Sequence, residues 1–333
     1  MTTENKRRAA IIGTGFYVPE RVMTNHDMEK IVDTSDQWIV ERTGIKERHI
    51  AADDVATSDI AYEAAKMALD DAGITAADLD LVVVATLTPD HPTPSTASLL
   101  QKRLGADHAA AFDLQAACSG FVYATTVAAQ FIENGFYKNV LVIGAETLSK
   151  YINWEDRNTC VLFGDGAGAA VFTAAEDGSG ILSFDLGSDG RGPELLGIPG
   201  GGTRYPANED TIARKVNRIH MDGKEVFRFA VKALPATLKR SLEKAGASAD
   251  ELTWIVPHQA NIRIIEAAAK RLAQPLDRFV INIERYGNIS AASIPIALAE
   301  ANAAGKLKKG DLVALAGFGA GLTWASCVMR WAK

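Results

Sequence analysis

Segments of the first half of the chain recur in the second half, about 170 residues later. Leu69–Gly73, followed by a short loop and a Val-rich run, matches Leu242–Gly246 at an offset of 173 residues. A second block matches at an offset of 170, where the predicted helix from Cys118 to Gly135 corresponds to that from Asn288 to Gly305. This second match predicts that Cys118 and Asn288 begin equivalent helices and point toward a shared axis.

A third, Gly-rich block pairs Phe163–Gly168 with Phe318–Gly321. Chance can explain any one match between Ala-rich or Gly-rich segments, but three blocks in the same order favour a duplication. A duplicated α/β unit predicts a pseudo-two-fold core, with sites at strand ends and helix starts where the halves meet. We therefore expect two similar halves, residues 1–178 and 179–333.

Short β-branched runs alternate along the chain with Ala-rich stretches of helical periodicity, a pattern that predicts an α/β fold with a largely parallel sheet. The predicted strands are Ala10–Ile12, Leu81–Val84, Val140–Ile143, Ala169–Phe172, Trp254–Val256 and Leu312–Leu315. The predicted helices are Ile60–Ala72, Gly120–Asn134, Phe227–Ala245, Ile262–Leu272 and Ala291–Ala303.

The composition is that of a globular protein that buries a large core. Of the 333 residues, 47% are hydrophobic and 23% are charged, and the formal charge of −6 argues against nucleic acid and anionic membranes as partners. Three cysteines without a CxxC pair predict neither a disulfide framework nor a zinc site. No run of about 18 apolar residues and no signal-peptide pattern occurs, so we expect a cytoplasmic protein.

Gly13-Thr-Gly15 follows the first predicted strand, where a dinucleotide-binding loop would lie. The third glycine of that fingerprint is missing, and Pro19 interrupts the helix that should follow. We therefore expect no dinucleotide cofactor.

Cys118 lies in Ala116-Ala-Cys-Ser-Gly120, at the predicted start of a helix. Unpaired amide groups and the helix dipole at such a position favour an anion, so we expect a lowered thiol pKa and a nucleophilic thiolate. The alternative is a buried structural cysteine, the commoner fate of a free cysteine. For Cys160 and Cys327, which sit in apolar strand-like runs, that structural interpretation is retained.

Two further polar residues follow predicted buried segments. His258, in Val256-Pro-His-Gln-Ala-Asn261, comes directly after a strand, where open α/β sheets place ligands. Asn288, in Tyr286-Gly-Asn-Ile-Ser290, could equally be a plain helix N-cap. On sequence grounds alone, a site residue and a structural residue are both open for each.

Together, Cys118, His258 and Asn288 resemble the active-site set of the thiolase superfamily, specifically its β-ketoacyl-ACP synthase III branch. The resemblance spans the chain in six ordered motifs: Asp33–Ile45, Ala117–Phe121, Phe163–Ala169, Val256–Arg263, Gly287–Ser293 and Gly317–Trp324. It implies a thiolase-like fold, with two duplicated α/β halves in a five-layered αβαβα core. It also implies a homodimer and substrates that are acyl-CoA and malonyl-ACP, without a metal or other cofactor.

The resemblance assigns roles to the three residues. Cys118 would attack an acyl-CoA thioester and hold the primer as an acyl-enzyme. His258 and Asn288 would donate hydrogen bonds to the malonyl thioester oxygen, stabilising the enolate as CO₂ leaves. The loop Phe318, Gly319 and Ala320 would supply an aromatic gate and an oxyanion-hole amide beside that of Cys118.

The family pattern also implies a binding surface for CoA and pantetheine. Its members here are Thr34, Trp38, Arg42, Arg157, Asn261 and Arg263. Trp38 and Arg157 would stack on the adenine, and Arg42 would lie near the phosphates. Arg263 and neighbouring basic residues would meet the acidic acyl carrier protein.

Two positions depart from the pattern. Ala320 stands where many relatives have a third consecutive glycine, so the backbone there must accommodate a Cβ. Thr93 stands where a bulky residue often closes the acyl pocket across the dimer, which leads to the hypothesis that primers longer than acetyl fit.

Two other functions remain open. One is a related condensing enzyme of secondary metabolism that uses the same residues on other acyl donors. The other is a non-catalytic acyl-CoA binding protein, which would leave the Cys-His-Asn set unexplained.

Overall fold

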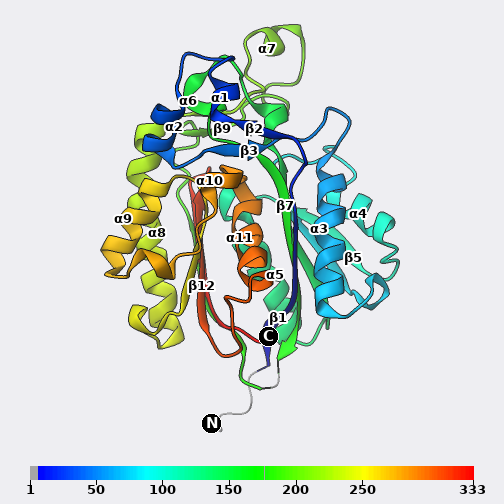
Figure 1. Ribbon diagram of the computed structural model, residues 1–333. Coiled ribbons are helices and arrows are strands. Elements are labelled where there is room, and N and C mark those ends of the chain that lie inside the picture. Colours follow the sequence, from blue (N-terminus) through cyan, green and yellow to red (C-terminus); the bar gives the residue numbers. More distant parts are fainter. Residues whose placement is uncertain (1–6, 176) are drawn as a thin grey trace.

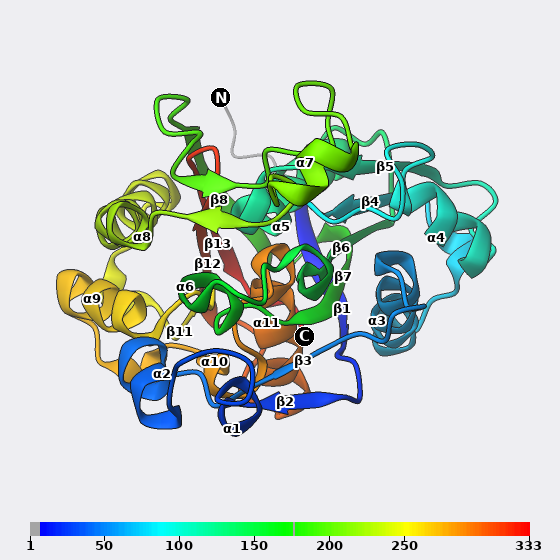
Figure 2. The ribbon, with the colours of Figure 1, turned by 90° about the horizontal axis from the view of Figure 1, so that it is seen from above.

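The computed structural model, which describes residues 7–175 and 177–333, contains two large mixed sheets in five alternating layers (Figure 1). The first sheet has the strand order β1-β7-β6-β4-β5, and the second has the order β11-β12-β13-β8. From one side to the other, the layers are helices α8 and α9, the second sheet, helices α5 and α11, the first sheet, and helices α3 and α4 (Figure 2). Residues 1–6 of the predicted first half lie outside the described residues, and the predicted boundary at 178/179, between β7 and β8, stays a prediction.

Every predicted strand lies inside an observed one, but the prediction of a largely parallel sheet is wrong. The strands are β1 (Arg8–Tyr17), β4 (Leu81–Ala85), β5 (Ala110–Leu114), β6 (Val140–Thr147), β7 (Asp165–Ala175), β8 (Gly180–Ser188), β11 (Trp254–Pro257), β12 (Leu312–Gly319) and β13 (Thr323–Arg330). Only β6-β4, β4-β5 and β11-β12 pair in parallel, whereas β1-β7, β7-β6, β12-β13 and β13-β8 are antiparallel. The physical reason is clearest at β12-β13, where a turn too short for a crossover helix joins the strands.

The five predicted helices are also present. The principal helices are α3 (Thr57–Ala72), α4 (Thr96–Leu104), α5 (Gly120–Glu133), α8 (Gly223–Ala245), α9 (Ile262–Leu272) and α11 (Ser293–Ala303). Every residue from Ser293 to Ala299 of α11 is buried, because sheets cover this helix on both sides. Within the described ranges, no helix has the length and apolarity needed to cross a membrane.

The order of elements repeats, but not in the predicted register. A short 3-10 turn precedes each central helix, at Ala117–Ser119 before α5 and at Ser290–Ala292 before α11. The offset at these helix starts is therefore 173, so Cys118 corresponds to Ala291 rather than to Asn288. The prediction aligned the closing glycines, and it failed because α5 has 14 residues and α11 has only 11.

The third predicted block is not equivalent either. Phe163–Gly168 leads into β7, which corresponds to β13, whereas Phe318 and Gly319 end β12. The Gly-rich composition of both segments therefore reflects separate packing needs.

Gly13 and Gly15 of β1 serve packing of the sheet against a helix. A Cβ on Gly13 would lie 2.3 Å from the carbonyl oxygen of Ala68 in α3, and one on Gly15 would lie 2.4 Å from that of Ala64. Because α3 lies directly on this strand, only glycine fits at either position. This contact accounts for the Gly-x-Gly pattern without a dinucleotide.

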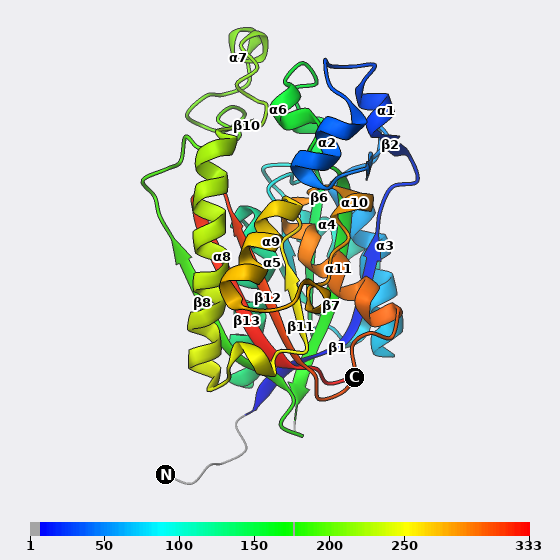
Figure 3. The same ribbon diagram turned by 60° about the vertical axis from the view of Figure 1, so that its left-hand side comes forward.

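Short elements gather over one end of the layers and form a cap (Figures 1 and 3). They are β2 (Val22–Thr24), α1 (Asn25–Met28), α2 (Asp36–Thr43), β3 (Glu47–His49), α6 (Arg157–Cys160), β9 (Leu196–Gly197), α7 (Glu209–Ala213) and β10 (His220–Met221), with α10 (Ile283–Tyr286) beneath. The fully buried guanidinium of Arg48 donates to the carbonyl oxygens of Met23 and Val161 and to Asn25 Oδ1. These bonds fasten the N-terminal part of the cap to the segment after α6.

Candidate active site

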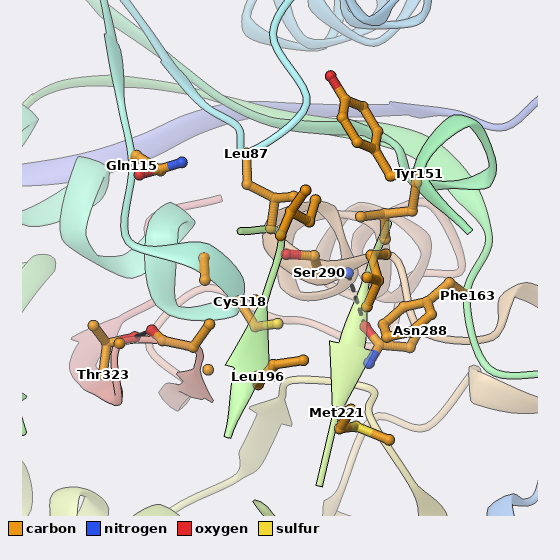
Figure 4. Close-up of a pocket in the computed structure, with 18 of the residues that line it drawn as sticks. Leu87, Gln115, Cys118, Tyr151, Phe163, Leu196, Met221, Asn288, Ser290 and Thr323 are labelled. Atoms are coloured by element: carbon orange, nitrogen blue, oxygen red, sulfur yellow. Dashed lines mark hydrogen bonds between the residues drawn. The ribbon is translucent and has the colours of Figure 1, made fainter. Parts of the chain in front are cut away.

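A cavity of about 770 Å³ lies beneath the cap, and Cys118, His258 and Asn288 all line it. Figure 4 shows Cys118 and Asn288 in the wall of this cavity. Cys118 comes from the turn before α5, His258 from the loop after β11, and Asn288 from the segment before α11. The fold thus unites three side chains that the sequence separates by up to 170 residues. Most of the wall is apolar and includes Leu87, Leu148, Phe163, Leu196, Ile198, Met221, Phe227 and Phe318.

The Cys118 thiol is neutral in the free protein, which contradicts the expected lowering of its pKa. Its side chain is buried, and this loss of water raises the thiol pKa to about 12, although the hydroxyl of Ser290 acts in the opposite direction. α5 begins only at Gly120, so Cys118 lies in the preceding turn rather than in the first turn of the helix. Burial therefore outweighs any contribution of the helix dipole.

Asn288 presents its amide nitrogen to the cavity. Its Oδ1 accepts a hydrogen bond of 2.9 Å from the backbone N–H of Ser290 (Figure 4). The backbone N–H of Asn288 donates to the carbonyl oxygen of Leu162. Because the oxygen is already engaged on the protein side, the two Nδ2 hydrogens are free to bind a ligand oxygen.

His258 is an uncharged group in this site. It is 1% exposed, and burial lowers its pKa to about 3, so the imidazole is neutral near physiological pH. Its backbone N–H donates to the carbonyl oxygen of Ala316, and its ring packs edge-on against Phe318 with centroids 5.4 Å apart. The Nδ1 atom has no hydrogen-bond partner among the described residues. A neutral imidazole in this position can donate one hydrogen bond without bringing a charge.

The end of β12 lies against the nucleophile. A Cβ on Gly319 would stand 2.7 Å from the backbone nitrogen of Cys118 and 3.0 Å from its Cβ, so a glycine is required for this approach. Ala320 and Gly321 also line the cavity. The φ of Ala320 is not in the left-handed region, whereas that of the next residue, Gly321, is +134°. The Cβ that Ala320 adds is therefore tolerated without left-handed strain.

Trp38, Arg42 and Arg157 form a cluster at the cap. The guanidinium carbons of Arg42 and Arg157 lie 4.8 Å and 5.1 Å from the centre of the Trp38 ring. Arg157 also donates a hydrogen bond of 2.8 Å to the carbonyl oxygen of Asp33, next to Thr34, whose buried hydroxyl has no partner among the described residues. The structure thus brings together residues that lie more than 100 positions apart.

Asn261 links this cluster to the cavity. It caps α9 through the backbone N–H of Arg263, donates from Nδ2 to the carbonyl oxygen of Arg42 at 2.8 Å, and lines the cavity. Arg263 is exposed and lies over the ring of Phe227, which also lines the cavity. Asn261 therefore connects the Trp38 cluster with the cavity, whereas Arg263 lies outside the lining and meets it through Phe227.

Thr93 is exposed and does not line the cavity of the single chain, although its neighbours Pro89 to Pro92 do. The hypothesis that Thr93 closes the acyl pocket across a dimer stays a prediction.

Two polar residues near Cys118 were not singled out from the sequence. Ser290 lines the cavity, and Glu146 is fully buried on β6 behind it. A serine after Asn288 and a glutamate in an apolar strand carry no local signal, because their proximity to Cys118 arises only from the fold. Among the described residues, no group of three or more His, Cys, Asp or Glu side chains could hold a metal ion.

Comparisons with known proteins give a consistent result. Residues 112–190 match the family model described as 3-oxoacyl-[acyl-carrier-protein (ACP)] synthase III, and residues 242–331 match the model of its C-terminal part. The chain is 56% identical over 323 residues to the beta-ketoacyl-[acyl-carrier-protein] synthase III of Desulfitobacterium hafniense (strain DSM 10664 / DCB-2), covering 97% of this chain and 98% of the relative.

Solved structures agree with this match. The 3-oxoacyl-[acyl-carrier-protein] synthase III of Aquifex aeolicus VF5 superposes with a TM-score of 0.90 at 49% identity, covering 97% of this chain and all of that one. The priming beta-ketosynthase of the R1128 polyketide biosynthetic pathway superposes with a TM-score of 0.91 at 35% identity, covering 100% of this chain and 99% of that one. The thiolase-like fold expected from the resemblance is confirmed.

Proposed function

The chain belongs to the 3-oxoacyl-[acyl-carrier-protein] synthase III family, and from this premise we propose that Cys118, His258 and Asn288 perform the family's reaction. That reaction is the decarboxylative condensation of an acyl-CoA primer with malonyl-ACP, which gives 3-oxoacyl-ACP, CoA and CO₂ and initiates fatty-acid biosynthesis. The observation that carries the assignment is that all three residues line one cavity.

In the first half-reaction, Cys118 Sγ attacks the primer carbonyl and CoA leaves. The charge on the tetrahedral oxygen is stabilised by the backbone N–H of Cys118 together with an N–H from the Gly319–Ala320 segment. The close packing of Gly319 on Cys118 supports this placement.

In the second half-reaction, malonyl-ACP replaces CoA and loses CO₂. Neutral His258 and the Nδ2 group of Asn288 donate hydrogen bonds to the thioester oxygen, where the enolate charge develops. The enolate carbon then attacks the acyl group on Cys118 and expels the Cys118 sulfur as a thiolate, which takes up a proton from solvent to restore the thiol. Neutrality at His258 and the engaged Oδ1 of Asn288 support the donor roles. Each step uses the chain's own groups, so no cofactor takes part.

The substrates enter past Trp38. Its ring and the Arg157 guanidinium bind the adenine, with Thr34 beside the base, and Arg42 binds phosphate oxygens. Arg157 is paired with Asp33 at 3.8 Å, whereas the exposed guanidinium groups of Arg42 and Arg263 form no ion pair among the described residues. These two groups give the entrance positive charge in an acidic protein, which suits CoA and an acidic carrier protein. The cytoplasm, where both substrates are made, is the proposed location.

Replacing Trp38 by Ala is expected to raise the KM for acyl-CoA about tenfold, because the stacking surface for the base is lost. The KM for malonyl-ACP should not change, since the carrier's pantetheine has no adenine. Steady-state kinetics with each substrate varied in turn would measure both. A parallel rise in the two constants would contradict the adenine assignment.

We expect a homodimer joined along β5. This strand ends the first sheet, so one row of its backbone groups is unpaired among the described residues, and its residues Ala111 to Leu114 are only partly exposed. Antiparallel pairing with a second copy would continue the sheet and bring the partner's Thr93 loop toward the acyl pocket. Size-exclusion chromatography with light scattering should give a molar mass twice that of one chain. The mass of a single chain would refute the interface along β5.

The proposed function can be tested by mass spectrometry of the intact protein. The protein would be incubated with acetyl-, isobutyryl- or octanoyl-CoA and then with malonyl-ACP. A mass gain equal to the acyl group, discharged by malonyl-ACP with formation of 3-oxoacyl-ACP, is the expected result. Loading without discharge by malonyl-ACP would favour the condensing enzyme of secondary metabolism, and binding without loading would favour the acyl-CoA binding protein.

A further inference from the structure

The structure leaves one step of acyl transfer without an assigned group: the removal of the Cys118 proton. The thiol is buried and protonated near neutral pH, so attack on a thioester must release a proton. The question is therefore which nearby group accepts it.

Ser290 and Cys118 line the same cavity (Figure 4), and the residue after Ser290 packs against β6, the strand that carries Glu146. In keeping with this placement, the Ser290 hydroxyl lowers the pKa of the Cys118 thiol and of the Glu146 carboxyl, against the larger effect of burial on both. Ser290 is 1% exposed, lines the cavity, and its Oγ completes no regular hydrogen bond with any described residue (Figure 4). A buried hydroxyl without a fixed partner is free to turn between two groups.

The position of Ser290 is fixed by its backbone. Its φ is +44°, and its N–H is held by Asn288 Oδ1 at 2.9 Å. The residue after it, Ala291, packs against Gly144, two positions before Glu146 on β6. The turn before α11 therefore carries the hydroxyl to the end of the strand that holds the carboxyl.

Glu146 is a fully buried carboxyl without an ion-pair partner in residues 7–175 and 177–333. Its Oε2 accepts hydrogen bonds from Thr88 Oγ1 at 2.6 Å, from Thr86 Oγ1 at 3.3 Å and from the backbone N–H of Leu87 at 3.2 Å. Burial raises its pKa to about 7, the range in which a general base works well at neutral pH.

The other titratable groups around Glu146 do not compete for this role. Burial, and to a smaller extent the charge of Glu146, raise the pKa of Tyr151, so this phenol stays neutral. Asp165, on the neighbouring strand β7, is engaged by the backbone N–H groups of Ser149 and Ala51 and by the Ser149 hydroxyl.

We propose that Glu146 accepts the proton of Cys118 through the hydroxyl of Ser290 during acyl transfer. The Sγ–H proton passes to Ser290 Oγ while the hydroxyl proton of Ser290 passes to the Glu146 carboxylate. The sulfur electron pair forms the bond to the acyl carbon, and the bond from that carbon to the CoA sulfur breaks, leaving its electron pair on that sulfur.

The relay then runs in reverse. Protonated Glu146 returns its proton through Ser290 to the CoA thiolate, so the products are acyl-Cys118, neutral CoA thiol and ionised Glu146. The net change is an exchange of an acyl group and a proton between two sulfur atoms. The proposal rests on the nucleophilic role of Cys118 in the proposed function.

The test is the pH profile of Cys118 alkylation by iodoacetamide, followed by intact mass between about pH 5.5 and about pH 9. In the unaltered protein, the rate should rise as Glu146 ionises, with an inflection near pH 7. Glu146→Gln and Ser290→Ala should each remove that inflection and slow alkylation about 10²-fold at pH 8. Cys118→Ser supplies the blank.

A third variant, Thr88→Val, keeps the carboxyl but removes its 2.6 Å hydrogen bond. That bond lowers the pKa of Glu146, so the inflection should move to higher pH. A purely structural role for Glu146 predicts no such movement. The matched control is Ser326→Ala, because Ser326 is about as buried as Ser290 but lies in β13 of the second sheet and bonds Thr237 of α8. The inflection of this variant should stay near pH 7.

The relay would be overturned if the inflection near pH 7 remained in Glu146→Gln or in Ser290→Ala, or if it did not move in Thr88→Val. Faster alkylation of Glu146→Gln would also overturn it, because that result would mean that the carboxylate only repels the thiolate. Alkylation needs neither CoA nor carrier protein, so these outcomes are independent of whether the condensation occurs. If Glu146→Gln does not fold, Ser290→Ala and Thr88→Val decide the question.

Discussion

Cys118→Ser is expected to abolish the acyl-enzyme and to lower condensation by at least about 10³-fold. Serine keeps the shape of the side chain, but its hydroxyl is a far weaker nucleophile at neutral pH, and the buried site would disfavour the alkoxide further. Intact mass after incubation with acetyl-CoA would measure loading, and release of CoA would measure turnover.

The matched control is Cys327→Ala. Cys327 is also fully buried, but it lies in β13, where its role is packing, so this variant should load fully if it folds. If Cys118→Ser were acylated by acetyl-CoA to the same extent as the unaltered protein, Cys118 would not be the nucleophile.

The second large effect is expected from loss of the enolate donors. His258→Ala and Asn288→Asp should each slow decarboxylation of malonyl-ACP by about 10²–10³-fold while the acyl-enzyme still forms. Asn288→Asp is the sharper change, because the carboxylate has nearly the same shape but cannot donate a hydrogen bond and would repel the enolate. CO₂ release, compared with loading followed by mass, separates the two half-reactions.

His108→Ala serves as the control, since His108 is exposed and is not among the residues that line the cavity. Equal losses of loading and decarboxylation in the Asn288 variant would contradict its assignment to the second half-reaction alone.

Hydrophobic periodicity predicted six of the nine strands in the two large sheets and five of the long helices, because each of these carries a continuous apolar pattern. It missed the helix α4 and the strands β5, β8 and β13. Of these, β5 is a short strand at the edge of its sheet whose Ala110–Leu114 sequence alternates weakly. It also missed strand direction, which depends on whether a helix or a tight turn joins two strands. Local patterns do not contain that information.

The sequence predicted which residues form the candidate site but not the protonation state of its cysteine. Cys118, His258 and Asn288 do share a cavity, as the resemblance implied. The expected thiolate was wrong, because a helix start is visible in sequence whereas burial of the sulfur is not. Ser290 and Glu146 escaped notice for the same reason: their relation to Cys118 is created by contact between β6 and the turn before α11.

Small residues of the first sheet lie directly against α11 and the turn before it, and this seam limits which parental sequences can be combined in one chimaeric enzyme. A Cβ on Gly144 would lie 2.2 Å from the carbonyl oxygen of Ala291, and one on Gly168 would lie 2.5 Å from the backbone nitrogen of Ile296. The thiol is encoded before this seam and both enolate donors after it. A chimaera that took its primer-loading half from one parent and its decarboxylating half from another could therefore mix their substrate preferences, provided that both parents contributed side chains this small along the seam.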